Sequence, residues 1–310
     1  MTGGKLRCFV ALVLLCAGWP ASAADVELGR RLFFDTRLSS DGRVACADCH
    51  QPTHAFTVPS AVAQRPDGPP GLRRPPSLLS AASRTHWGWD GRGTELARQC
   101  LVPLEDPSEM GPLDVDQLVN RLKAEPVYAR ALASAPALDV IGAALAAYVA
   151  SLDTPSRFDH FIAGDAQALD ERELRGLHIF RTKAGCANCH TGPALTDEQF
   201  HNLGLSSFGE RSQDLGRHGV TGRLEDAGAF RTPSLRHVAQ RAPYMHHGLI
   251  PTLEGVVHFY NHGGGEVWVR NEREAAEPLH RAAAQRSPHL RSLGLSDEEK
   301  AALLAFLRAL

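Results

Sequence analysis

The sequence predicts a mainly α-helical protein of two domains, and three observations support this. Helix-start patterns recur along the chain, whereas the alternation typical of strands is scarce. The pattern Cys-x-x-Cys-His occurs twice, beginning at Cys46 and at Cys186, and this separation suits two similar-sized domains rather than a short repeat. The 310 residues are 43% hydrophobic and 22% charged, which is ordinary for a soluble chain of about two domains.

Charge and hydropathy exclude two classes of protein. The net charge is −2 with His counted as neutral, and no stripe of Lys and Arg runs along the chain. Nucleic acid is therefore not an expected partner. The only long apolar run lies at the start of the chain, which excludes a protein that crosses a membrane several times.

The first residues have the pattern of a secretory signal peptide. Lys5 and Arg7 precede an apolar stretch over residues 9–18, and the small residues 21–23 fit a signal peptidase site. We expect residues 1–23 to be removed and the mature protein, beginning near Ala24, to reside in the periplasm. A retained membrane anchor is the alternative, although the apolar stretch is short for a bilayer.

Helices are expected where apolar residues recur at helical spacing, around residues 118–122 and 141–149. Asp170 with Glu173, and Ser296 with Glu299, form capping-box patterns that mark two further helix starts. Gly- and Pro-rich connections cover residues 58–76 and 204–222. The Thr-Pro-Ser segment at 154–156 marks a boundary between predicted domains 24–153 and 154–310.

Both Cys-x-x-Cys-His motifs indicate covalent attachment of haem c. Each thiol adds to one vinyl group of the porphyrin, and the adjacent His serves as the proximal iron ligand. A zinc site and a redox dithiol are the alternatives, but neither needs a His directly after each Cys pair. Two cytochrome-c-like helical domains, each with one haem and packed against each other, are therefore expected. The predicted haem-binding residues are Cys46, Cys49, His50, Cys186, Cys189 and His190.

The remaining cysteine of the mature chain, Cys100, leaves an odd number, which argues against a disulfide framework. We interpret Cys100 as a small buried hydrophobic residue.

Longer motifs around these sites are more specific. With them the chain resembles the bacterial di-haem cytochrome c peroxidase/MauG family over almost all of the mature sequence. The motifs that carry the resemblance are Trp89-Asp90-Gly91-Arg92, Glu109-Met110-Gly111, residues 197–203, residues 230–236 and residues 242–248.

The resemblance implies roles for residues of the first domain. His50 resembles the proximal ligand of a peroxide-binding haem, and Glu109 the acid/base that moves a proton between the peroxide oxygens. Gln99 and Pro103 resemble companions of Glu109 in the pocket, and Trp89 the Trp between the haems. From the residues alone, the alternatives are that Glu109 is a solvated acid, Trp89 a packing residue, and Gln99 and Pro103 ordinary helix and turn residues.

Many peroxidases of this family hold a removable His on the distal side of the first haem. No His lies between His54 and His86 here, and neither of these two stands at the expected position. The resemblance thus predicts a first haem that is permanently open and reacts without prior reduction.

The resemblance also implies a distal ligand for the second haem. Tyr260 stands where the peroxidase branch has a Met and MauG-like members have a Tyr, so we expect His190 and Tyr260 to ligate the second iron. A phenolate is a hard anionic donor that favours Fe(III) and a low potential. Met245 and His258 are alternative ligands, and a buried structural role is the alternative for Tyr260.

The family usually holds a calcium ion between the haems, and the matching carbonyls here belong to Arg241 and Pro243. Arg74 replaces the Asn of the family pattern, and a cation beside an Arg is electrostatically unfavourable. We therefore doubt that calcium binds and expect Arg74 to take its place.

The sequence as a whole predicts a periplasmic di-haem peroxidase acting on hydrogen peroxide. Its electrons would come from a small donor protein, a cytochrome c or a cupredoxin, or from residues of a protein substrate as in MauG. A non-catalytic di-haem electron-transfer cytochrome is the alternative, and the sequence predicts no oligomeric state.

Overall fold

The computed structural model describes residues 22–69, 71–133 and 135–310. It confirms that the chain is predominantly helical. The predicted signal peptide lies outside the described residues except for its last two positions, so its removal stays a prediction. Among the residues that the structure describes, no helix has both the length and the apolar character to cross a membrane.

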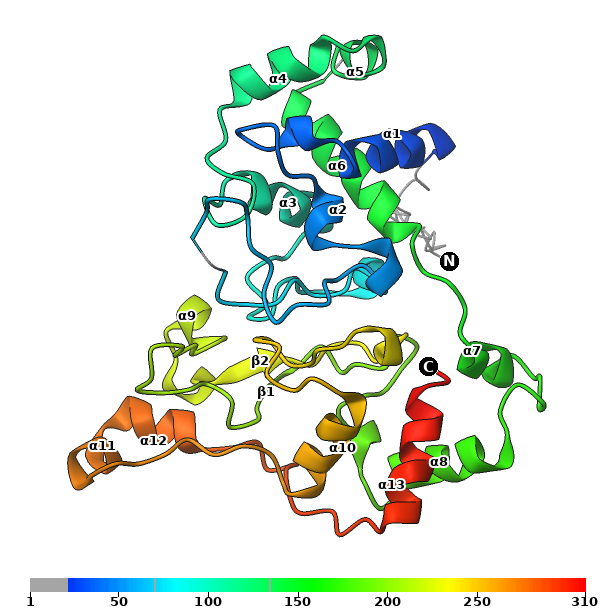
Figure 1. The fold of residues 1–310 in the computed structure, drawn as a ribbon, viewed down its shortest axis with the longest axis vertical. Helices are drawn as coiled ribbons and strands as arrows, with labels where there is room; N and C mark the ends of the chain where they lie inside the picture. The colour runs from blue at the N-terminus through cyan, green and yellow to red at the C-terminus, as the bar shows by residue number, and fades with distance from the viewer. Residues whose placement is uncertain (1–21, 70, 134) are drawn as a thin grey trace, which may run out of the picture.

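The chain forms two halves that stack one above the other in Figure 1, joined by the connection from α6 to α7. The elements of the upper half are α1 (Ala23–Phe33), η1 (Thr36–Leu38), α2 (Cys46–Cys49), η2 (Pro52–His54), η3 (Ala81–Ser83), α3 (Leu96–Leu101), η4 (Val102–Leu104), α4 (Val115–Lys123), α5 (Pro126–Ala131) and α6 (Ala137–Ala150).

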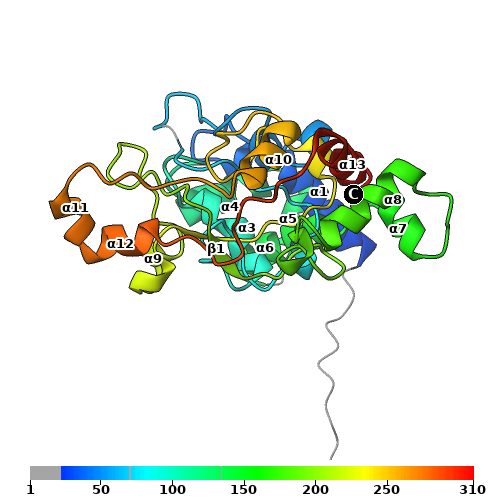
Figure 2. The same ribbon diagram turned by 90° about the horizontal axis from the view of Figure 1, so that it is seen from below.

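The lower half continues with α7 (Arg157–Ile162), α8 (Glu171–Arg181), η5 (Cys186–Asn188), β1 (Phe200–Asn202), α9 (His218–Thr221), η6 (Leu224–Asp226), β2 (Ala229–Arg231), η7 (Val238–Gln240), α10 (Leu253–Asn261), α11 (Glu272–Ala276), α12 (Pro278–Ala284) and α13 (Asp297–Leu307). Seen from below, α11 and α12 extend at one end of this half, and α7 and α8 lie at the other (Figure 2).

The four helices expected from the sequence are present as α4, α6, α8 and α13. At α8, the Asp170 side chain accepts from the Glu173 N–H at 2.8 Å, and the Glu173 carboxylate accepts from the Asp170 N–H at 2.9 Å. Ser296 and Glu299 form the same reciprocal cap on α13. These caps satisfy N–H groups that a helix start would otherwise leave without partners.

In the upper half, α1 crosses α6 at very close range. Gly29 makes this approach possible, because a Cβ at this position would collide with the carbonyl oxygen of Ala144. The helices enclose a buried cluster that includes Leu32, Phe33, Leu118, Leu122, Ile141, Leu145 and Tyr148. Removal of this apolar surface from water is the main force that holds the half together.

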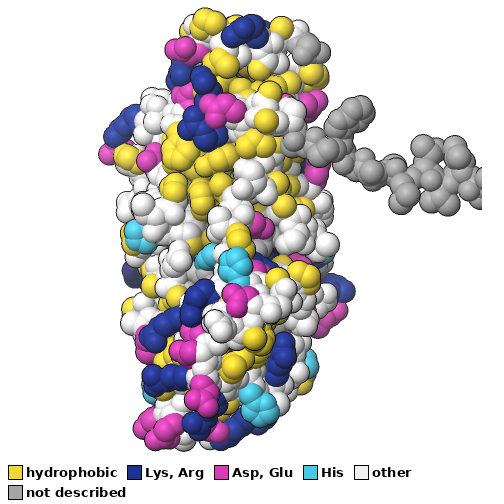
Figure 3. Space-filling view, turned by 90° about the vertical axis from the view of Figure 1, so that its right-hand side faces the viewer, with side chains coloured by type: hydrophobic (Ala, Val, Ile, Leu, Met, Phe, Trp, Pro, Cys, Tyr) yellow, Lys and Arg dark blue, Asp and Glu magenta, His cyan; other side chains and the backbone are white. Residues whose placement is uncertain are grey.

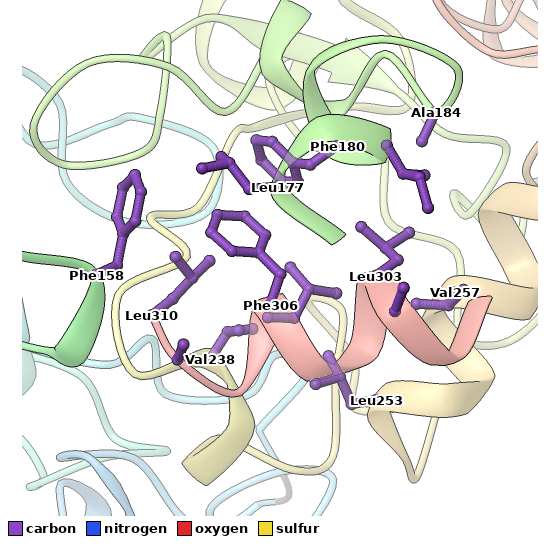
Figure 4. Packing of buried hydrophobic residues seen from close by; sticks show 14 of the residues in the cluster. Phe158, Leu177, Phe180, Ala184, Val238, Leu253, Val257, Leu303, Phe306 and Leu310 are labelled. Carbon is purple, nitrogen blue, oxygen red and sulfur yellow. The ribbon is translucent and has the colours of Figure 1, made fainter. Parts of the chain in front are cut away.

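The lower half repeats the arrangement with α8 and α13. Gly176 lies against Ala302 of α13, and a Cβ at Gly176 would collide with the Ala302 carbonyl oxygen. Phe306 is fully buried, with its ring 5.3 Å from the rings of both Phe158 and Phe180. Figure 4 shows these side chains converging on α13.

A short antiparallel sheet, β1 paired with β2, lies on the side of the lower half that faces the upper half (Figure 1). Its register pairs Phe200 with Arg231 and Asn202 with Ala229. The Arg231 N–H donates to the Trp89 carbonyl at 2.8 Å, so β2 is hydrogen-bonded to the upper half.

Ion pairs and hydrogen bonds also join the halves. Arg73 of the upper half contacts Asp90 of its own half and Asp214 of the lower half, each at 2.6 Å. Arg217 donates to the carbonyls of Asp90 and Gly91 at 3.0 and 2.8 Å. On the face drawn in Figure 3, acidic and basic side chains are interspersed over the lower half, in keeping with the net charge of −2.

Candidate haem sites and active site

The first Cys-x-x-Cys-His motif forms the short helix α2 and the residue that follows it. The His50 N–H donates to the Cys46 carbonyl at 2.9 Å, and the His50 Nδ1 lies 3.0 Å from the Phe56 carbonyl oxygen. A proton on Nδ1 leaves the lone pair of Nε2 free for a metal. Burial lowers the pKa of His50 to about 4, so the ring is neutral, as iron ligation requires.

The second motif is built in the same way in η5. The His190 N–H donates to the Cys186 carbonyl at 2.9 Å, and the His190 Nδ1 lies 3.1 Å from the Leu195 carbonyl oxygen. Burial raises the pKa of the Cys46 and Cys186 thiols to about 12, and neither residue forms a disulfide. Both motifs therefore fit the attachment of haem c.

Glu109 lies in a turn that follows η4 and is fixed by its neighbours. The Glu109 N–H donates to the Asp106 carbonyl at 3.0 Å, and the next N–H, from Met110, donates to the Pro103 carbonyl at 3.0 Å. Glu109 is close enough to Cys49 for its charge to raise the pKa of that thiol, after burial the next largest cause. The turn thus presents a carboxyl to the first motif.

Protein atoms around Glu109 favour its neutral form. Burial raises the pKa of Glu109, Asp106 raises it further, and Arg92 opposes the shift. The side chain nevertheless remains accessible to solvent. A carboxyl with a raised pKa that can still be reached is suited to proton transfer.

Gln99 and Cys100 lie on α3. The Gln99 Oε1 is buried without a hydrogen-bond partner among the described residues. Cys100 packs against the core of the upper half, and burial raises the pKa of its thiol to about 12. This agrees with the interpretation of Cys100 as a small hydrophobic residue.

A large cavity surrounds the second motif and is lined by both halves. It contains about 1590 Å³ of space free of atoms, including solvent at its mouth. Its lining includes Cys186, Cys189, His190, Met245 and Tyr260 of the lower half, with Arg74, Arg84 and Trp89 of the upper half.

The three side chains considered as ligands of the second iron differ in whether they line this cavity. Tyr260, near the end of α10, and Met245 both line it, whereas His258 is exposed. Burial and the nearby thiols of Cys186 and Cys189 raise the pKa of Tyr260. Its phenol therefore stays neutral unless a cation such as ferric iron lies at its oxygen.

Trp89 lies at the junction of the halves. Its indole Nε1 donates to the Arg74 carbonyl at 2.7 Å, and its ring meets that of His246 edge-on at a centroid distance of 6.4 Å. His246 stacks on Phe230 with centroids 3.7 Å apart. The hydrogen bond to Arg74 and the packing against His246 together hold the indole in one orientation.

The candidate calcium position contains the Arg74 side chain. Its guanidinium donates to the carbonyls of Val58, Ser60 and Ala242, the last two at 3.3 and 3.1 Å. Ala242 lies between Arg241 and Pro243, whose carbonyls match the calcium ligands of the family pattern. Because a guanidinium already occupies this carbonyl-lined space, the residues do not fit a calcium ion.

The sequence reasoning missed the buried side chains of Arg84, Arg231 and Arg241, all of which line the cavity. Arg241 was considered only for its carbonyl. A signal existed, because Pro-Ser-Leu is followed by Arg at the same offset in both halves, ending at Arg84 and at Arg241.

Comparisons with known proteins identify the family of this chain. The family model described as di-haem cytochrome c peroxidase matches residues 23–167. Cytochrome-c peroxidase IdrP1 of Denitromonas iodatirespirans is 32% identical over 94% of this chain and 82% of its own length. The methylamine utilization protein MauG of Methylorubrum extorquens is 38% identical over 79% of this chain and 70% of its own.

Solved structures give the same result. A MauG-like protein associated with microbial copper homeostasis superposes with a TM-score of 0.82 at 34% identity, covering 94% of this chain and 90% of that one. The diheme peroxidase BthA from Burkholderia thailandensis has a TM-score of 0.78 at 26% identity, covering 93% and 86%. The chain therefore belongs to the di-haem cytochrome c peroxidase and MauG family and is a haem oxidoreductase.

Proposed function

We propose that the protein is a periplasmic peroxidase that reduces hydrogen peroxide at the haem of its first domain, residues 24–153. The second domain, residues 154–310, carries the electron-transfer haem. The reaction takes two electrons and two protons per peroxide and releases two waters. The observation that carries this proposal is Glu109, a reachable carboxyl with a raised pKa beside the first motif.

The residues of the chain have separate tasks in this reaction. Cys46 and Cys49 attach the haem, and His50 supplies Nε2 to the iron because its Nδ1 is turned to Phe56. When bound, the haem supplies the iron that binds peroxide and accepts electrons singly.

Glu109 takes the proton from the near oxygen of peroxide and returns it to the far oxygen, so that water can leave. General acid–base catalysis of this kind contributes about 10²–10⁴ in rate. Pro103 holds the turn that carries Glu109. The Oε1 of Gln99, without a hydrogen-bond partner among the described residues, can accept a hydrogen bond from a ligand.

Trp89 connects the two haems in this proposal, and Tyr260 ligates the iron of the second. Both side chains line the cavity around the second motif. A phenolate ligand favours Fe(III) and higher oxidation states. The second haem would therefore hold part of the oxidising equivalents that peroxide leaves in the enzyme. The oxidised enzyme would then react with peroxide directly.

Rapid mixing of the oxidised holoprotein with hydrogen peroxide tests this function. We expect an immediate change in the Soret band, and one high-spin and one low-spin ferric signal in the resting enzyme. Two low-spin irons that are inert to peroxide would instead identify a non-catalytic electron-transfer cytochrome. Turnover only after one-electron reduction would show that the oxidised enzyme does not react with peroxide directly.

The electron source is either a small redox protein or a protein substrate. Tyr260, at the position where MauG-like members have a Tyr, favours a protein substrate. Steady-state assays with reduced cytochrome c and cupredoxin, beside mass spectrometry of co-expressed envelope proteins, distinguish these sources.

A further inference from the structure

Four buried arginines converge on the cavity around the second motif. Their exposed fractions are 5% for Arg74, 7% for Arg84, 2% for Arg231 and 7% for Arg241. Two come from each half of the molecule. Arginine is rarely buried without a partner, because an unpaired charge in a protein interior is costly.

Two of the four have protein partners that account for them. Arg231 forms an ion pair with Glu198 at 2.9 Å. Arg74 donates to three main-chain carbonyls. These contacts leave Arg84 and Arg241 to be explained.

Arg84 and Arg241 lack a carboxylate partner among the described residues. Arg84 donates through Nη2 to the carbonyls of Ser77 and Leu79 at 2.9 and 2.8 Å. Arg241 donates through Nη1 to the Ser234 carbonyl at 2.8 Å. The Nε of Arg84, and the Nε and Nη2 of Arg241, are buried and have no hydrogen-bond partner among the described residues.

The two side chains are equivalent positions of an internal repeat. Pro76-Ser77-Leu78 precedes Arg84 just as Pro233-Ser234-Leu235 precedes Arg241, and each Arg follows a 3₁₀ turn, η3 or η7. In both halves the guanidinium donates to the carbonyl of the repeat's Ser. The same arrangement in both halves argues for a shared task rather than accidental burial.

The surroundings of the pair carry an excess of positive charge. Burial, with a further contribution from neighbouring arginines, lowers the pKa of Arg84 and of Arg241 to about 9. Glu198 and Asp153 are the carboxylates that oppose this shift at Arg84, and Asp153 opposes it at Arg241. Four arginines are thus accompanied by two carboxylates, and an anionic ligand would balance the remaining positive charge.

We propose that Arg84 and Arg241 bind the propionate carboxylates of the haem attached at Cys186 and Cys189, Arg241 from its own half and Arg84 from the opposite half. The inference rests on the haem binding of the proposed function. Propionates are the only anionic groups of haem, and the guanidinium fork matches a carboxylate in shape and charge. The haem would thereby bridge the two halves.

The test measures the midpoint potential of the second haem against pH in the holoprotein variants Arg84→Gln and Arg241→Gln. With its arginine present, a buried propionate stays ionised across neutral pH. Without it, burial raises the propionate pKa, and the group takes up a proton when the iron is reduced. We expect each variant to gain a pH-dependent potential, up to one proton per electron, and a protonated carboxyl band in infrared difference spectra.

Two control variants separate this role from packing. Arg241→Lys keeps the charge and should retain the wild-type pH profile. Arg217→Gln removes an arginine that joins the halves through the carbonyls of Asp90 and Gly91 but is not part of the cavity lining, and should leave the profile unchanged.

The outcomes decide the question without reference to peroxide activity. Loss of the second haem from the Gln variants, with retention in Arg241→Lys and Arg217→Gln, also supports the proposal, because the charge is then what holds the haem. Wild-type potentials and pH profiles in both Gln variants would overturn it. So would loss of haem from Arg241→Lys as well, since packing rather than charge would then be responsible. A chain without any haem would contradict the proposed function itself.

Discussion

The upper and lower halves of the molecule share an arrangement of helices and motifs, here called the frame. They differ in the side chains that lie beside each Cys-x-x-Cys-His motif. In each, a Gly on an earlier helix, Gly29 of α1 or Gly176 of α8, lets the last helix approach closely. In each, a Cys-x-x-Cys-His turn directs the His Nδ1 to a carbonyl. In each, a Pro-Ser-Leu segment leads to a buried Arg. The frame thus repeats a candidate haem-binding arrangement but does not decide the chemistry of either site.

The difference lies in the segments placed beside the haem motifs. The upper half inserts α3 and the following turn, which bring Cys100 and Glu109 to the first motif. The lower half inserts α10, which brings Tyr260 into the cavity of the second. An acid/base group on one side and a hard oxygen donor on the other are expected to make one site reactive and close the other.

The largest effect is expected from Glu109→Gln. Both haems should remain attached while the rate of reaction with peroxide falls by about 10²–10⁴. Because the base form of Glu109 is needed and its pKa is raised, the wild-type rate should rise with pH through that pKa, whereas the variant should show no such step. Stopped-flow spectroscopy measures both. Glu105→Gln, an exposed neighbour, is the control, and equal rates in the two variants would exclude Glu109 from proton transfer.

The shared frame can be broken in either half by one added methyl group. Gly29→Ala and Gly176→Ala each force a Cβ against the facing carbonyl, and we expect a loss of about 1–3 kcal/mol in the free energy of unfolding. Gly219→Ala, where a Cβ meets nothing within 4 Å, should not destabilise. Denaturant unfolding measures all three, and a large loss in only one half would show that the two helix pairs are not equivalent.

How far the sequence predicts this molecule depends on the range of the interaction. The starts of α8 and α13 were predictable because their caps lie within four residues. The contact of Gly29 with Ala144 was not predictable, because a Gly within a helix does not indicate which residue will pack against it. The roles of Arg84 and Arg241 were missed because the repeat that relates them lies in irregular segments, where little else is identical.

Tyr260→Phe sharpens the comparison at the second site. It removes the hydroxyl but keeps the ring that lines the cavity. If the phenolate is an iron ligand, the potential of the second haem should rise by roughly 0.1 V, a fraction of the ~0.8 V over which axial ligands act. The first haem should keep its spectrum. Tyr244→Phe is the matched control, because its hydroxyl donates to the Val238 carbonyl at 3.1 Å in the same cavity. Identical potentials in both variants would show that Tyr260 is a structural residue and not an iron ligand.

The smallest effect is expected from removal of calcium, at the boundary between the halves. Since the Arg74 guanidinium binds the carbonyls of Val58, Ser60 and Ala242, a calcium chelator should leave the spectra, the potentials and the melting temperature of the wild type unchanged. Arg74→Asn frees these carbonyls at a cost of about 1–3 kcal/mol in the free energy of unfolding. Added calcium should recover part of this loss in Arg74→Asn and none in Arg43→Asn, which removes an exposed arginine. A wild type that loses activity in the chelator and recovers it with calcium would show that Arg74 does not replace the ion.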